Sequence, residues 1–335
     1  MAKDATTFST YEAIGNREDL SNAIYDISPM ETPVVSMIPR VKATGRLHEW
    51  QTDSLAAAAA NAQIEGDEIS IQASPATTRV SNVCQILSKA LSVSRTQRVV
   101  DTAGRADEYD YQIAKRGKEL KRDIEFAVTQ NGESTLASSA TARTMAGMES
   151  WLQSTTANAA APYTSLFASV GNVHTSPGFT SGSVTAPTDS TDQGVLTSTT
   201  GEAALKSVIR QAWTNGGNPE VVLTGPFNKQ KISAFGGIAT QYRDNQQVGP
   251  GVIIAAADIY VSDYGQHKIV PSRFNRDRTV MVLDMDYWAL AELDPIEVIP
   301  LAKTGDADKA FMVTELTLES RQSLASGKIV DLTTS

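Results

Sequence analysis

The sequence predicts an α+β fold, in which helices and strands occupy separate stretches of the chain. A long helical pattern covers about residues 101–131, where apolar residues recur at steps of three, four and seven. After residue 258 the pattern changes to strands with turn residues between them. Strand runs that follow helices in this way are typical of the α+β class.

Composition excludes several functional classes. The chain has 335 residues, 41% of them apolar and 20% charged, which is typical of a folded protein with a sizeable core. A net charge of −9 argues against a reader of nucleic-acid sequence. Cys84 is the only cysteine, so an intramolecular disulfide is impossible. No apolar run approaches the ~20 residues needed to span a membrane, and the first residues do not resemble a secretion signal. We therefore expect neither membrane association nor secretion.

Residues 1–44 are predicted to form an arm rather than a domain. Pro29, Pro33 and Pro39 interrupt the segment and favour extended conformations before each proline. The apolar residues between them are too numerous for a disordered tail. The arm is therefore expected to pack on its own subunit or on a neighbour.

Residues 45–92 are predicted to form a long hairpin. Leu47–Trp50 begins one strand and Thr77–Ser94 supplies the return, while the connection between them is small, polar and acidic. A hairpin with so few bulky residues at its tip is poorly stabilised alone. We therefore predict that Trp50 and Ile86 are intersubunit contacts, buried mainly when a neighbour is present.

The long helix lies within region 93–133. Asp101 or Thr102 is expected to cap its start, and Asn131-Gly132 to end it in a left-handed conformation. Leu120 and Ile124 are expected to face the core.

The opposite face of this helix is rich in charge. Its basic residues are interleaved with acids: Lys115, Arg116, Lys118, Lys121 and Arg122 with Glu119, Asp123 and Glu125. Such a cluster could contact phosphate, but the interleaved acids favour a solvated face or intersubunit ion pairs. Lys118 and Arg122 are therefore predicted intersubunit contacts.

The rest of the chain divides into three regions. Residues 134–200 are rich in Ser, Thr, Ala and Gly and read as an insertion or connection, with short strands around 163–170. Residues 201–285 contain two helices and several strands, the first helix opening with a capping box at Thr199–Glu202. Residues 286–335 are predicted strands that close the fold through a hairpin with its tip at Thr304–Asp308.

Residue-level motifs resemble one protein family. The relevant segments are Arg79–Ile86, Val93–Gln97, Glu119–Glu125, Val261–Gly265, Ile269–Arg273, Leu301–Asp306 and Glu315–Glu319. In this order they resemble the major capsid proteins of tailed phages and herpesviruses, which share the Hong Kong ninety-seven fold. The resemblance implies an N-terminal arm at 1–44, an extended loop at 45–92, and a spine helix with the peripheral domain at 93–133. It further implies an axial domain at 201–285 and a return to the peripheral domain at 286–335.

The resemblance also implies a function and partners. The chain would assemble with itself into hexamers and pentamers of a closed shell around double-stranded DNA, without sequence-specific binding. A scaffolding protein, a portal and a decoration protein would be further partners, and the protein would be found in the virion and in the host cytoplasm during assembly. Gln246 and Gly249 would lie near five-fold and six-fold axes, and Asp306 near three-fold contacts.

Two other functions stay open from the residues alone. The chain could be a phage tail or decoration protein, or a cytoplasmic α+β enzyme with residues 134–200 as an active-site or receptor-binding insertion. Against an enzyme, His48, His174 and His267 lie in different segments without the spacing of metal ligands. We expect no catalytic residue, no cofactor and no metal.

Overall fold

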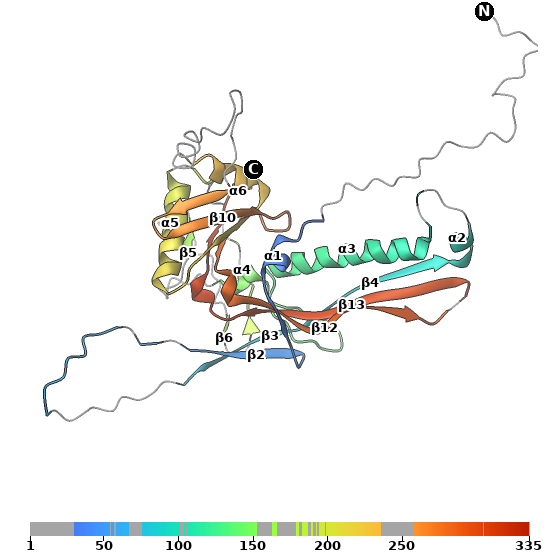
Figure 1. The fold of residues 1–335 in the computed structure, drawn as a ribbon, viewed down its shortest axis with the longest axis horizontal. Coiled ribbons are helices and arrows are strands. Elements are labelled where there is room, and N and C mark those ends of the chain that lie inside the picture. The colour runs from blue at the N-terminus through green and yellow to red at the C-terminus, as the bar shows by residue number, and fades with distance from the viewer. Residues whose placement is uncertain are drawn as a thin grey trace, which may run out of the picture.

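The structure is a computed structural model. It describes residues 30–53, 55–56, 58–66, 76–100, 104, 106–152, 163–165, 179–180, 183–186, 189, 192, 194–197, 199–235, 258–303 and 305–334. Two sheets and one long helix dominate the described residues (Figure 1).

A four-stranded sheet forms one part of the molecule. Its strands follow the order β1 (Arg40–Lys42), β12 (Trp288–Leu301), β13 (Ala307–Ser320) and β4 (Gln85–Ser94). β1 is parallel to β12, and the other neighbours are antiparallel. Helix α3 (Glu108–Thr129) lies along one face of this sheet, and the short helix α2 (Arg95–Val99) connects it to β4 (Figure 1).

A six-stranded sheet forms the second part. Its order is β5 (Tyr163–Ser165), β14 (Gly327–Val330), β11 (Val280–Leu283), β8 (Val221–Thr224), β10 (Gly265–Pro271) and β9 (Ile259–Ser262). Helices α5 (Thr200–Thr214) and α6 (Pro226–Ser233) pack on one face through a cluster that includes Leu205, Ile209 and Ile232. The alternate residues Leu223 and Met281 belong to the other main core.

That other core joins the two sheets. It contains Ile124 and Val128 of α3, Trp151 of the short helix α4 (Met148–Trp151), and Leu290 and Leu318 of the four-stranded sheet. The end of the arm reaches the same core through α1 (Pro33–Met37). Val34 is buried there, and the backbone N–H groups of Val34 and Val35 donate to the Glu125 carboxylate at 3.0 and 2.9 Å. The described end of the arm therefore packs on its own subunit.

The remaining described elements are short. They are β2 (Leu47–Thr52), β3 (Thr78–Val83), β6 (Phe179–Thr180), β7 (Ser183–Val184) and the 3-10 turns Met285–Tyr287 and Ser323–Ala325. β2 and β3 pair as an antiparallel hairpin that extends from the body on the side opposite to the N-terminal end of α3 (Figure 1).

The hairpin predicted for residues 45–92 differs from the structure at its return strand. The return divides at Cys84, because β3 pairs with β2 whereas β4 pairs with β13 of the four-stranded sheet. The buried amide of Asn82 fixes this division: it donates to the Leu318 and Ala146 carbonyls and accepts from the Ala146 N–H. Residues 85–92 are therefore part of a sheet and not of the extended loop.

The predicted ends of the long helix were also wrong. α3 begins at Glu108, where the Asp107 carboxylate caps it by accepting from the Tyr109 N–H at 2.8 Å. Asp101 and Thr102 lie outside the described residues. At the other end Gln130 is extended, and Gly132 does not have a positive φ. The Gln130 side chain donates to the Phe274 carbonyl instead, which ties this end of the helix to the body.

Two further details differ. The capping box at Thr199–Glu202 does not form; instead the Thr197 hydroxyl accepts from the Thr200 N–H at 3.1 Å. The last strand, β14, pairs with β11 and β5 in the six-stranded sheet, although residues 286–335 were expected to return to the peripheral domain. In the predicted insertion, the expected short strand is present as β5.

Candidate functional site

The base of the β2–β3 hairpin is fixed to the body by aromatic and polar contacts. The Trp50 ring packs against His48 and Trp151 at centroid distances of 5.6 and 5.4 Å, and its Nε1 donates to the Ser320 carbonyl at 2.9 Å. His48 Nε2 lies 3.0 Å from a Glu319 carboxylate oxygen, and this hydrogen bond is the main cause of a lowered pKa for Glu319. Half-buried Trp50 therefore already has partners within its own subunit.

The distal part of the hairpin has a different environment. Within residues 53–66 the described positions form neither helix nor strand, and the Leu55 and Ile64 side chains are 98% and 78% exposed. Covering apolar side chains that are exposed to this extent with another surface lowers the free energy. The hairpin is thus anchored at its base, whereas Leu55 and Ile64 beyond it are uncovered.

Ile86 lies on an open face of the four-stranded sheet. α3 covers one face through Leu91 and Val93, which pack with Tyr109 and Ile113. On the opposite face Ile86 is 48% exposed. The pairing registers place further partly apolar rows on that face: Ala90, Phe311 and Ile299, and Ser88, Val313 and Glu297. This set with Ile86 and Leu301 is here called the open sheet face.

The two faces of α3 differ as expected from the sequence. Leu120 and Ile124 are buried, which confirms the prediction that they face the core. Lys118 is exposed, whereas the Arg122 guanidinium lies over the Phe274 ring at 5.9 Å. No contact with a second subunit is tested for either residue, so both stay predictions.

The tip between β12 and β13 carries acids with two different environments. The Asp308 carboxylate pairs with Lys303 and Arg98, the latter at 2.7 Å, and these cations lower its pKa. Asp306 is exposed, and its carbonyl accepts from the Arg95 N–H. Only the Asp306 side chain therefore stays a candidate for contact with a neighbour. Gln246 and Gly249 lie outside the described residues.

A buried charge cluster beside the six-stranded sheet was not predicted from the sequence. Lys328 of β14 is fully buried and donates to the Glu149 carbonyl at 2.9 Å, and desolvation lowers its pKa to about 8. The buried Glu149 carboxylate accepts from Arg276 at 3.1 Å and from Thr279 at 2.9 Å. These contacts join α4, the loop before β11 and the C-terminal strand, so their role is structural.

The cysteine and the histidines also have structural partners. Cys84 is buried, and desolvation raises the pKa of its thiol to about 11, so it stays protonated and unreactive. The buried His267 ring donates from Nδ1 to the Pro219 carbonyl, and its Nε2 accepts from the Ser262 hydroxyl at 2.6 Å. Desolvation lowers the pKa of His267, which keeps the ring neutral. These bonds fix the β9–β10 turn. His174 lies outside the described residues.

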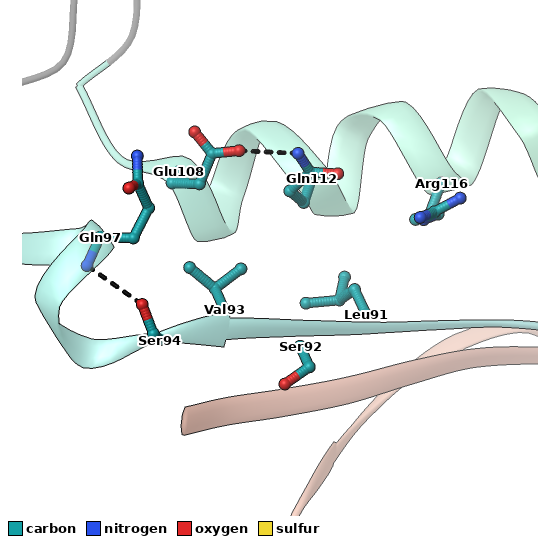
Figure 2. Close-up of a pocket in the computed structure, with 8 residues that line it drawn as sticks. All are labelled: Leu91, Ser92, Val93, Ser94, Gln97, Glu108, Gln112 and Arg116. Carbon is teal, nitrogen blue, oxygen red and sulfur yellow. Dashed lines mark hydrogen bonds between the residues drawn. The ribbon is translucent and has the colours of Figure 1, made fainter. Parts of the chain in front are cut away.

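One cavity of about 350 Å³ lies between the start of α3 and the end of β4 (Figure 2). Its polar residues bond to each other: Gln112 donates to Glu108 at 2.7 Å, and the Gln97 N–H donates to the Ser94 hydroxyl. Across the described part of the chain, no three His, Cys, Asp or Glu side chains gather where they could hold a metal. No described helix has the length and apolarity to cross a membrane.

Comparison with known protein sequences gives a family match and a related protein. The sequence model of the SU10 major capsid protein family matches residues 3–333. The major capsid protein of Escherichia phage Phieco32 is 27% identical over 337 residues, covering 96% of both chains.

Solved structures share the fold at lower identity. A chain of the Cyanophage A-1(L) capsid asymmetric unit superposes with a TM-score of 0.65 at 14% identity, covering 98% of this chain and 99% of that one. A structure from Mycobacterium phage Bobi gives 0.56 at 12% identity, covering 94% and 95%. These neighbours have the Hong Kong ninety-seven fold of tailed-phage capsids. Because the family model spans nearly the whole sequence, the chain belongs to the SU10 major capsid protein family and functions as a subunit of a phage capsid shell.

Proposed function

We propose that the chain assembles with itself into the hexamers and pentamers of a closed icosahedral shell around the double-stranded DNA genome. The observation that carries this proposal is the hairpin, whose base is fixed by Trp50 while Leu55 and Ile64 near its tip are exposed. In a ring of copies, the neighbouring subunit offers a surface on which these side chains can be buried. The same contact then repeats between all neighbours of the ring.

The extended loop acts as a strap in this proposal. It lies on a neighbouring subunit, and the open sheet face around Ile86 is part of the surface that neighbours cover. Arg122 and the Asp306 side chain contact neighbouring subunits. Gln246 and Gly249 belong to loops close to the five-fold and six-fold axes.

Further partners follow from the same proposal. A scaffolding protein directs assembly in the host cytoplasm, a portal occupies one vertex, and a decoration protein binds the finished shell. The chain itself has a structural role without catalysis. A solved structure from Phage G contains decoration proteins beside its major capsid proteins, which supports that class of partner here.

Deletion of residues 56–70 tests the strap. The shortened subunit is expected to be soluble and folded, with unchanged thermal unfolding, but negative-stain microscopy should show no closed shells. A matched control replaces the same residues with a Gly/Ser linker of equal length, which keeps the reach of the loop and removes its side-chain contacts. Normal-size particles from the deletion would refute the strap.

A further inference from the structure

The face of α3 turned away from the sheet carries a row of lysines. Lys115, Lys118 and Lys121 are all exposed and follow one another at steps of three residues. At a rise of 1.5 Å per residue the row spans roughly 9 Å of the helix axis. The buried Leu120 and Ile124 define the opposite side of the same helix.

The three acids interleaved with these lysines are engaged elsewhere. Glu119 pairs with Arg116 at 2.6 Å, and Asp123 pairs with Lys89 of β4 at 2.7 Å. Glu125 is buried and accepts hydrogen bonds from the arm. In the part of the chain that the structure describes, none of the three lysines forms an ion pair. Charges that alternate along the sequence are therefore separated in space, which removes the main objection to phosphate binding.

We propose that this lysine face lines the inside of the shell and contacts the phosphates of the enclosed duplex DNA, without regard to base sequence, in place of the intersubunit contact predicted for Lys118. The proposal rests on the proposed function. α3 and the four-stranded sheet form two layers (Figure 1), so in a wall one subunit thick the lysine face and the open sheet face look toward opposite sides. A local row of uncompensated positive charge in a chain of net charge −9 is favourable on the side that meets a polyanion.

Lysine suits such a contact. Its ammonium is a point charge on a flexible stem, so it can follow phosphates without a fixed register, unlike the planar fork of arginine. A contact of one subunit is weak at physiological salt, where screening acts over about 8 Å. Repetition over the inner wall sums many such contacts, whereas a free subunit should bind duplex DNA only weakly.

Site-specific photocrosslinking in DNA-filled particles tests the proposal. A photoreactive benzophenone amino acid is placed at Lys118 and, as a matched control, at Lys206, an exposed lysine of α5 that pairs with Glu202. After irradiation, DNA adducts at position 118 should exceed those at position 206 by about tenfold or more, because phosphate contact requires close approach.

Three results would overturn the proposal. Crosslinks from position 118 to another copy of the chain would assign the lysines to a subunit interface, and crosslinks to a different polypeptide would assign them to a protein partner. Equal DNA adducts at both positions would leave the face without a special role. A failure of the proposed function looks different, since no closed DNA-filled particle would then form.

A triple substitution gives an independent readout. Lys115→Gln, Lys118→Gln and Lys121→Gln together should leave subunit stability and particle size unchanged but lower the temperature at which particles release their DNA. The matched triple Lys→Arg variant keeps the charge and should behave as the parent. An unchanged release temperature in the Gln variant, or a loss of assembly that Arg restores, contradicts DNA contact.

Discussion

The two sheets of the subunit bury their residues in different ways. In the six-stranded sheet every residue of β8, β11 and β14 is buried, since helices cover one face and the main core covers the other. In the four-stranded sheet β4 alternates, so that only the residues facing α3 are buried near its end. One sheet is complete within a single chain, whereas the other leaves an apolar face for a second surface.

This difference separates folding from assembly. Substitutions around the six-stranded sheet should act on the stability of the isolated subunit, because its contacts are intramolecular. Substitutions on the open sheet face and in the extended loop should act on particle formation. The following predictions test that division, beginning with the largest expected effect.

Glu149→Ala should destabilise the subunit most. It removes one of the two carboxylates that pair with Arg276 and the strongest favourable charge near the buried Lys328, and breaking a buried ion pair by removing one partner costs roughly 3–5 kcal/mol. Denaturant unfolding of the unassembled subunit measures this cost. A variant with the parent's stability would mean that the cluster does not hold the C-terminal strand in place.

Leu120→Ala should lower the free energy of unfolding by roughly 2–5 kcal/mol, since its side chain is fully buried between α3 and the body. Lys118→Ala, two residues earlier on the exposed face, is the matched control and should unfold like the parent. Equal destabilisation by both substitutions would contradict the assignment of the two helix faces.

Stability should rise with pH between about pH 8 and 10.5 through Lys328. Its pKa is lowered to about 8 from the ordinary 10.5, so the unfolded chain binds the extra proton across this window. Integrating that difference gives a gain of about 3 kcal/mol on going to the upper end of the window. Lys328→Met should lack this gain, and comparing the two proteins removes contributions from other groups. Parallel pH profiles would exclude the effect.

Ile86→Ser should change subunit stability least, by about 0.5 kcal/mol or less, because the side chain is half exposed. It should nevertheless reduce the yield of closed particles, counted by microscopy. Leu87→Ser is the control on the opposite face of the same strand, where the side chain packs against the main core, and it should destabilise the subunit itself. Normal assembly by Ile86→Ser would remove the open sheet face from the interface.

Local patterns predicted much of this fold from the sequence. The period of the apolar residues located α3 and its buried face, and the two helices predicted within residues 201–285 are present as α5 and α6. The start of α3 was misplaced because several polar residues before Asp107 could equally cap a helix. Only the tertiary contact of Gln130 with Phe274 reveals where it ends.

Long-range features were not predictable in the same way. Strand patterns do not specify which strand pairs with which, so β4 was assigned to the hairpin and β14 to the wrong sheet. Lys328 in a short apolar strand could have signalled a buried charge, yet its partner Glu149 lies 179 residues away. The ion-pair partners of the acids on α3 likewise could be identified only from the three-dimensional structure.

A cryo-EM reconstruction of assembled particles tests the central claim most directly. If neighbours complete the four-stranded sheet and cover the extended loop, residues 55–66 of each subunit should lie on another copy, and the Ile86 side chain should be largely buried rather than 48% exposed. A map in which residues 55–66 contact only their own chain or solvent, with the open sheet face uncovered, would contradict the account.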